Sequence, residues 1–185
     1  MRTFFREILL TLILALAIFL LLQAALQSFI IVEHCMEPEF QEDERLLVNK
    51  VVYYFHEPER GDVIIFYPPL NPETVYIKRI IALPGESVEI KEGKVYIYKN
   101  GNVIELNEPH YIDPPRYTYN KATVPENEYF VLGDNRNNAN DSHKGWTVPR
   151  QDIIGKAWLS FWPAKEWGLV PRYPLQEQLA APSSK

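Results

Sequence analysis

Two side chains in this chain of 185 residues could form a nucleophile and its base. Cys35, the single cysteine, lies in the segment EHCMEPEF (residues 33–40), just after a long apolar run. Lys78 lies in VYIKRII, where the alternation along a strand places a cation among apolar neighbours. Burial disfavours an ammonium, so a lysine in such a place can accept a proton from a thiol. Two other interpretations stay open, since Cys35 could be an inert buried residue and Lys78 could reach solvent or pair with an acid.

A dense polar segment, GDNRNNANDSHKGW (residues 133–146), follows the apolar sequence EYFVL. Asp134, Arg136 and Asp141 can form charge-assisted hydrogen bonds that hold such a loop rigid. The acid pattern of a calcium loop breaks at Arg136, and no bidentate glutamate follows at the required offset. We therefore expect a supporting loop, and we predict no metal bound by Asp141 and His143.

The apolar run covers residues 8–32 without a charged residue. It is long enough to cross a bilayer, which takes roughly 20 residues. Arg2 and Arg6 precede it and favour a cytoplasmic N-terminus, with the chain after residue 32 on the outer face. A cleaved secretory signal is the alternative, although the following sequence LQAALQS is a poor cleavage site. We expect a retained, single-pass anchor in the cytoplasmic membrane.

Beyond the anchor, the pattern of apolar residues indicates short strands joined by turns with proline or glycine. A hairpin is expected to turn at Glu92-Gly93, and Gly155 is expected to mark a bulge. Residues 107–126 contain too many prolines for a regular element and are expected to form an ordered loop. The other strands are expected at residues 45–55, 61–69, 74–86, from 128 into the polar loop, and 152–163.

The fold class predicted from this pattern is mainly β, a coiled-sheet or barrel-like domain on one N-terminal membrane helix. The net charge of -5 and the lack of a basic block argue against a nucleic-acid surface. A single cysteine forms no internal disulfide. The expected divisions are a cytoplasmic N-terminus at 1–7, the anchor at 8–32, a β-rich domain at 33–165 and a tail at 166–185.

Three segments, in order, resemble the conserved boxes of the type I signal peptidases. These are membrane-anchored Ser–Lys proteases that remove signal peptides on the outer face of the membrane. CMEPEF is similar to the family's Ser-Met-x-Pro-Thr nucleophile box, and YIKRIIALPGE is similar to the box with the general-base lysine. GDNRNNANDSHKGWTVP is similar to the Gly-Asp-Asn-Arg box. The resemblance extends from the apolar run to about Pro163, and the last two boxes are highly specific.

This resemblance implies roles for individual residues. Cys35 occupies the place of the nucleophile and Lys78 the place of the base. The implied partners are exported preproteins with signal peptides, membrane lipid and the secretion translocon, with no nucleic acid, no metal and no cofactor. The supporting positions that match the boxes are Met36, Pro38, Gly133, Asp134, Asn135, Arg136 and Asp141.

The sequence departs from the family's pattern around the chemistry. Cys35 replaces serine, Glu33 stands where a small residue can supply an oxyanion donor, and Ala139 replaces a serine that would hydrogen-bond the lysine. Two hypotheses follow: a thiol endopeptidase that uses Cys35 and Lys78, or an impaired or inactive relative that binds exported chains. A thiol ionises more readily than a hydroxyl, which favours the first, and the Glu33 carboxylate would repel an oxyanion, which favours the second. Further departures are Glu39, Asp43 and His143.

Overall fold

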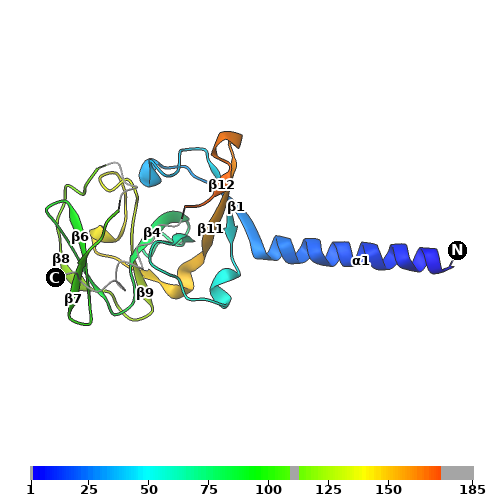
Figure 1. The fold of residues 1–185 in the computed structure, drawn as a ribbon, viewed down its shortest axis with the longest axis horizontal. Coiled ribbons are helices and arrows are strands. Elements are labelled where there is room, and N and C mark those ends of the chain that lie inside the picture. The colour runs from blue at the N-terminus through cyan, green and yellow to red at the C-terminus, as the bar shows by residue number, and fades with distance from the viewer. Residues whose placement is uncertain (1, 109–112, 172–185) are drawn as a thin grey trace.

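The structure, a computed structural model, describes residues 2–108 and 113–171. A single long helix, α1 (Arg2–Ala25), projects from a β-rich body (Figure 1). Its 24 residues give a length of about 36 Å, enough for the roughly 30 Å hydrocarbon core of a bilayer. The segment Phe4–Ala25 has a mean hydropathy of 2.8. It is the one helix of the described residues that is long and apolar enough to cross a membrane.

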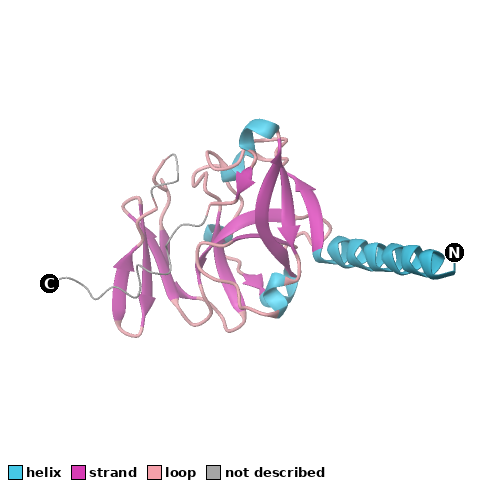
Figure 2. Cartoon of the chain, turned by 45° about the vertical axis from the view of Figure 1, so that its right-hand side comes forward, coloured by secondary structure: helices cyan, strands magenta, loops and turns pink. Residues whose placement is uncertain are grey.

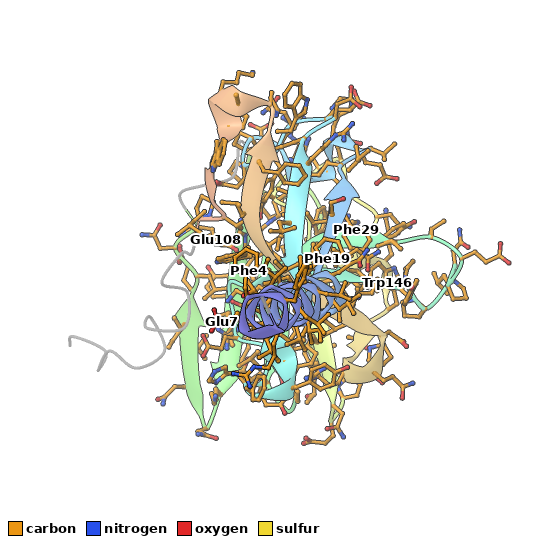
Figure 3. All side chains as sticks on the ribbon, turned by 90° about the vertical axis from the view of Figure 1, so that its right-hand side faces the viewer. Phe4, Glu7, Phe19, Phe29, Glu108 and Trp146 are labelled. Carbon is orange, nitrogen blue, oxygen red and sulfur yellow. The ribbon has the colours of Figure 1, made fainter. Side chains whose placement is uncertain are left out.

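The side chains of α1 are uncovered by the rest of the protein. From Phe4 to Ala24 every residue is exposed, and Figure 3, which looks along α1, shows Phe4, Glu7 and Phe19 around the helix. Exposing an apolar helix without a polar face to water is energetically unfavourable. This exposure is consistent with a membrane anchor.

The body consists of two antiparallel sheets (Figure 2). The larger sheet has the strand order β1-β2-β11-β3-β4-β9-β10, with β12 paired to β11. It lies next to α1, whereas the smaller sheet lies at the far end of the molecule (Figure 1). The strands of the larger sheet are β1 (Leu26–Ile30), β2 (Arg45–Asn49), β3 (Val63–Phe66), β4 (Tyr76–Ala82), β9 (Glu128–Leu132), β10 (Val148–Pro149), β11 (Ile153–Trp162) and β12 (Gly168–Leu169).

The smaller sheet has the order β7-β6-β5-β8. Its central hairpin turns at Glu92 and Gly93, whose φ angles of 51° and 75° suit a tight two-residue turn, as predicted. Alternate residues of β5 and β6 are buried against β4 and β9, so that one core joins the two sheets. The strands are β5 (Ser87–Lys91), β6 (Lys94–Lys99), β7 (Asn102–Glu105) and β8 (Tyr119–Thr123).

Short 3-10 turns complete the described part of the chain. They are η1 (His34–Met36), η2 (Val52–Tyr54), η3 (Ser142–Lys144), η4 (Arg150–Asp152) and η5 (Ala164–Glu166). The mainly β fold with one apolar N-terminal helix is therefore confirmed. The expected bulge is present as well, since the register of β11 against β3 shifts between Ile153 and Gly155.

Four expected boundaries differ from those in the structure. The apolar run is not one helix to residue 32, because α1 ends at Ala25 and the next five residues pair with β2 as strand β1. The strand expected at 45–55 ends at Asn49, whose side-chain oxygen accepts the N–H groups of Val51 and Val52 and turns the chain.

The proline-rich segment 107–126 is not wholly a loop, because its proline-free part Tyr119–Thr123 pairs with β5. Its residues 109–112 lie outside the described residues. The expected tail at 166–185 begins with β12, which pairs with β11, and residues 172–185 also lie outside the described part.

Candidate active site

Cys35 is held in the core rather than on a surface loop. It lies in the turn η1, which follows β1, and its side chain is 2% exposed. Met36, fully buried, and Phe40 pack in the same apolar cluster against β2 and β3. Pro38 is exposed on the outside of this turn. The thiol therefore has a fixed place at the end of the first strand.

Lys78 reaches the thiol from the strand β4. Its Nζ lies 2.9 Å from the Cys35 Sγ and donates a hydrogen bond to the Ile77 carbonyl oxygen, also at 2.9 Å. The side chain is 1% exposed, so the alternative in which Lys78 reaches solvent is wrong. Neither of these two partners is a carboxylate, so the structure also gives no support to the pairing of Lys78 with an acid. The structure thus joins the two residues that the sequence singled out, which lie 43 positions apart.

Burial dominates the ionisation of the thiol. It raises the pKa of Cys35, while the charge of Lys78 and its hydrogen bond lower that pKa without cancelling the rise. The carboxylates of Glu33 and Asp141 raise the pKa of Cys35 slightly further. The resting thiol is therefore protonated near neutral pH. It depends on a base to become a thiolate more than an exposed cysteine does.

The polar loop holds the backbone of the turn that carries Cys35. The Asn135 N–H donates to the Cys35 carbonyl oxygen at 3.0 Å, and the Asn135 Nδ2 donates to the His34 carbonyl oxygen at 3.0 Å. Gly133 lies so close that a Cβ there would be 2.5 Å from the Cys35 oxygen. Only a residue without a side chain allows this approach.

A buried ion pair joins the same loop to the strand that carries Lys78. Arg79 donates from Nε and Nη2 to the two carboxylate oxygens of Asp134 at 2.8 and 2.6 Å, and from Nη1 to the Gly61 carbonyl oxygen. Both side chains of the pair are fully buried. Because Arg79 directly follows Lys78, the pair holds the loop next to the part of β4 that carries Lys78.

A second bidentate pair braces the loop from behind. Arg136 donates to both carboxylate oxygens of Glu108 at 2.6 Å and to the Gly133 carbonyl oxygen at 3.0 Å. Burial alone would lower the pKa of Arg136, but the charge of Glu108 raises it above its usual range. The guanidinium is therefore permanently charged, and its role in the structure is support rather than proton transfer.

Asp141 closes the loop on itself. It accepts hydrogen bonds from the Gly133 N–H at 2.9 Å and from the His143 N–H, and its Oδ1 lies 2.5 Å from the His143 Nδ1. The His143 ring stacks on Tyr117, with ring centroids 4.0 Å apart. In the described residues, no group of three His, Cys, Asp or Glu side chains is placed to hold a metal ion.

The two remaining candidate residues lie on the open sides of Cys35. The methyl group of Ala139 packs beside the apolar cluster of Cys35 and offers no hydrogen bond to Lys78. Glu33 is exposed, and it borders two cavities that share Cys35 and Val32 in their walls. One cavity, of about 410 Å³, is mainly apolar. The other, of about 470 Å³, has polar walls.

Comparison with known proteins gives the family of this chain. The family model of the signal peptidases (peptidase S26) matches residues 4–162. The chain belongs to the signal peptidase family. A probable signal peptidase I-1 of Synechocystis sp. is 43% identical over 140 residues, 72% of this chain and 69% of its relative. A signal peptidase I of Leptolyngbya laminosa is 45% identical over 141 residues, 72% of this chain and 67% of that protein.

One solved relative is also similar. The crystal structure of a signal peptidase I from Enterococcus faecalis has 34% sequence identity and a TM-score of 0.44, and the match covers 55% of this chain and 97% of that one.

Several residues of the site were not predicted from the sequence. Arg79 and Glu108, the partners of Asp134 and Arg136, lie 55 and 28 positions away from them along the chain. The only sequence signal for Arg79 was an arginine between apolar residues of a strand. Glu108 carries no comparable signal, because it precedes a proline in a segment whose composition is typical of a loop.

Proposed function

We propose that this chain removes signal peptides from exported preproteins, with Cys35 as the nucleophile and Lys78 as the general base. The observation that carries the proposal is the 2.9 Å contact between Lys78 Nζ and Cys35 Sγ in a buried site of a signal-peptidase fold. A base within hydrogen-bond distance of a thiol can generate the thiolate at the moment of attack.

Two open strand edges offer a place for the substrate. β1 is the last strand on its side of the larger sheet, and β9 pairs only with the second half of β4, from Arg79 onward. The edges of β1 and of Tyr76–Lys78 both border the apolar cavity. An extended peptide that adds to such an edge directs alternate side chains to one wall, so the first and third residues before the cut would enter the apolar cavity.

The chemistry follows from this placement. Neutral Lys78 takes the proton from Sγ, and the sulfur attacks the carbonyl carbon of the scissile bond. The Cys35 N–H donates to the resulting oxyanion; one such donor contributes roughly 3–4 kcal/mol. Protonated Lys78 then gives its proton to the amine that leaves, which produces a thioester. Lys78 next takes a proton from water, whose oxygen attacks the thioester. The C–S bond breaks, Lys78 returns the proton to the leaving sulfur to restore the thiol, and the new carboxylic acid loses its proton to solvent.

The proposal includes a membrane topology. The positive residues Arg2 and Arg6 stay in the cytoplasm, α1 crosses the lipid, and the sheets lie on the outer face near the translocon, where exported chains emerge. Added protease should then digest the body in cells whose outer layers are opened but whose inner membrane is intact. Full protection of the body would contradict this orientation.

Binding without cleavage is the second candidate function. The raised pKa of Cys35, the carboxylate of Glu33 beside it and the methyl group of Ala139 all weaken the chemistry. The open edges and the apolar cavity would still accept an extended chain. This candidate predicts affinity for preproteins with no product.

A cleavage assay separates the two candidates. The full-length protein in detergent is incubated with a preprotein, beside Cys35→Ala, Cys35→Ser and Lys78→Met, each checked for its thermal midpoint. We expect a shortened product from the original protein, reduced product from Cys35→Ser, and none from the other two. Product formation by Cys35→Ala or Lys78→Met at the original rate would overturn the assigned roles. No product from any form, with the preprotein still bound, would establish the second candidate.

A further inference from the structure

A substrate cut at Cys35 must continue past it on both sides. The apolar cavity, on the side of β1 and β4, has walls that include Phe29, Ile31 and Ile77. These apolar walls fit the residues before the cut. The cavity of about 470 Å³ borders Cys35 from the side of the polar loop, so it is left for the residues after the cut. Its walls are Val32, Glu33, His34, Cys35, Asn137, Asn138, Ala139 and Asn140.

The asparagine side chains in the walls of this cavity differ in their hydrogen bonding. Asn137 is occupied, because its Oδ1 accepts from the Arg116 N–H and its Nδ2 donates to the Pro114 carbonyl oxygen. Asn138 is exposed, and its side chain forms no hydrogen bond with the described residues. A carboxamide in that position can donate to and accept from the backbone of a passing peptide.

The charge at the mouth of the cavity is negative. Glu33 contributes a carboxylate next to Cys35. His34 is the basic side chain among the cavity walls, but it faces two acids of its own turn, with its Nδ1 2.8 Å from Glu37 and its Nε2 3.5 Å from Glu42. When His34 is protonated, its positive charge is offset by the carboxylates of Glu37 and Glu42. The negative charge of Glu33 therefore has no balancing positive charge among the cavity walls.

We propose that the polar cavity binds the first residues of the mature chain, and that Glu33 makes it select a cationic over an anionic side chain there. This inference rests on the proposed function for the direction of the bound peptide. It assigns Glu33 a role in substrate choice, in addition to any effect on the oxyanion. The selection acts through an exposed charge, so it weakens as salt screens the carboxylate.

Binding measurements test this without depending on turnover. Fluorescent peptides that span a cut site differ only in Lys, Gln or Glu at the second residue after the cut. They are titrated into full-length Cys35→Ala in a non-ionic detergent. We expect Lys to bind more tightly than Gln and Gln more tightly than Glu, with roughly a three- to tenfold difference in Kd between Lys and Glu at low salt.

The decisive comparison adds Glu33→Gln to the same background. The ratio of Kd values for the Lys and Glu peptides should then fall to less than about twofold. Glu105→Gln is the matched control, because it removes an exposed carboxylate on β7 of the far sheet, and it should leave the ratio unchanged. Peptides with the same exchange at the second residue before the cut should show a smaller ratio.

Any of three results would overturn the inference, in addition to the absence of a charge preference. The first is a ratio of Kd values for the Lys and Glu peptides that is unchanged by Glu33→Gln. The second is a larger ratio when Lys and Glu are exchanged before the cut than after it. The third is no binding by any peptide. Peptides that bind without a charge preference, together with cleavage by the original protein, would refute the role of Glu33 and leave the proposed function intact. A charge preference without cleavage would keep the cavity's role and select the binding function.

Discussion

Gly133 lies where an added methyl group has no room. A Cβ there would be 2.5 Å from the Cys35 carbonyl oxygen and 2.6 Å from the Ala139 Cβ, whereas ordinary contacts begin at 3.4 Å. Gly133→Ala must therefore push the loop and the Cys35 carbonyl apart by 0.5 to 0.9 Å, the differences between 2.5 Å and the limits of 3.0 and 3.4 Å. Overpacking of this kind destabilises by about 1–3 kcal/mol, or about 2–12 °C in a chain of this size. A nucleophile displaced by about 1 Å loses roughly a hundredfold in rate.

Thermal melting in detergent and preprotein cleavage measure the two effects of Gly133→Ala. The alkylation rate of Cys35 gives a third readout that needs no turnover. Gly168→Ala is the matched control, because an added Cβ there meets nothing within 4 Å. An unchanged melting temperature would refute the argument from packing. A lower melting temperature with an unchanged cleavage and alkylation rate would show that Gly133 does not position the nucleophile.

Three further changes test the site. The pH midpoint for alkylation of Cys35 should lie above the ~8.5 of a free thiol, because burial raises the pKa of Cys35. Lys78→Met should move this midpoint higher, because the Lys78 cation lowers the pKa of the thiol. Equal midpoints with and without Lys78 would mean that the two residues do not interact. Arg136→Ala should cost about 3–5 kcal/mol by urea unfolding, since it removes the buried partner of Glu108, and unchanged stability beside a collapsed chemical step would contradict the supporting role. A preprotein with Phe in place of Ala one or three residues before the cut should resist cleavage, and equal processing of both forms would remove the assignment of the apolar cavity.

Local sequence signals predicted most of the strands. The hairpin at Glu92-Gly93 combines alternating apolar residues with a turn that favours glycine, and both signals lie within a few residues of each other. Strands β3, β4 and β11 were found for the same reason, with ends shortened by prolines and polar residues. The residues of the candidate site were predicted instead from the resemblance to the family's sequence boxes. Residue type and spacing alone left both Cys35 and Lys78 open to other interpretations.

The missed elements depend on distant partners. Residues 26–30 continue the uncharged run of the helix before them, and their pairing with β2 makes them a strand. Strand β8 is mostly exposed, without an alternating apolar pattern, and it forms because β5 offers an edge. Composition cannot reveal such choices, since the deciding hydrogen bonds are made with segments far along the chain.

The junction between α1 and the body contains no linker. Strand β1 begins at Leu26, directly after the last helical residue, Ala25, whose carbonyl oxygen accepts the N–H of Lys50 at 2.9 Å. The residues between the anchor and the body are therefore all part of regular structure, and no irregular segment separates α1 from β1. Under the proposed topology, the fold would set the distance between Cys35 and the lipid surface. Under the proposed function, the protein would measure the position of the cut from the bilayer surface, and its search for substrates would be reduced to diffusion in the plane of the membrane.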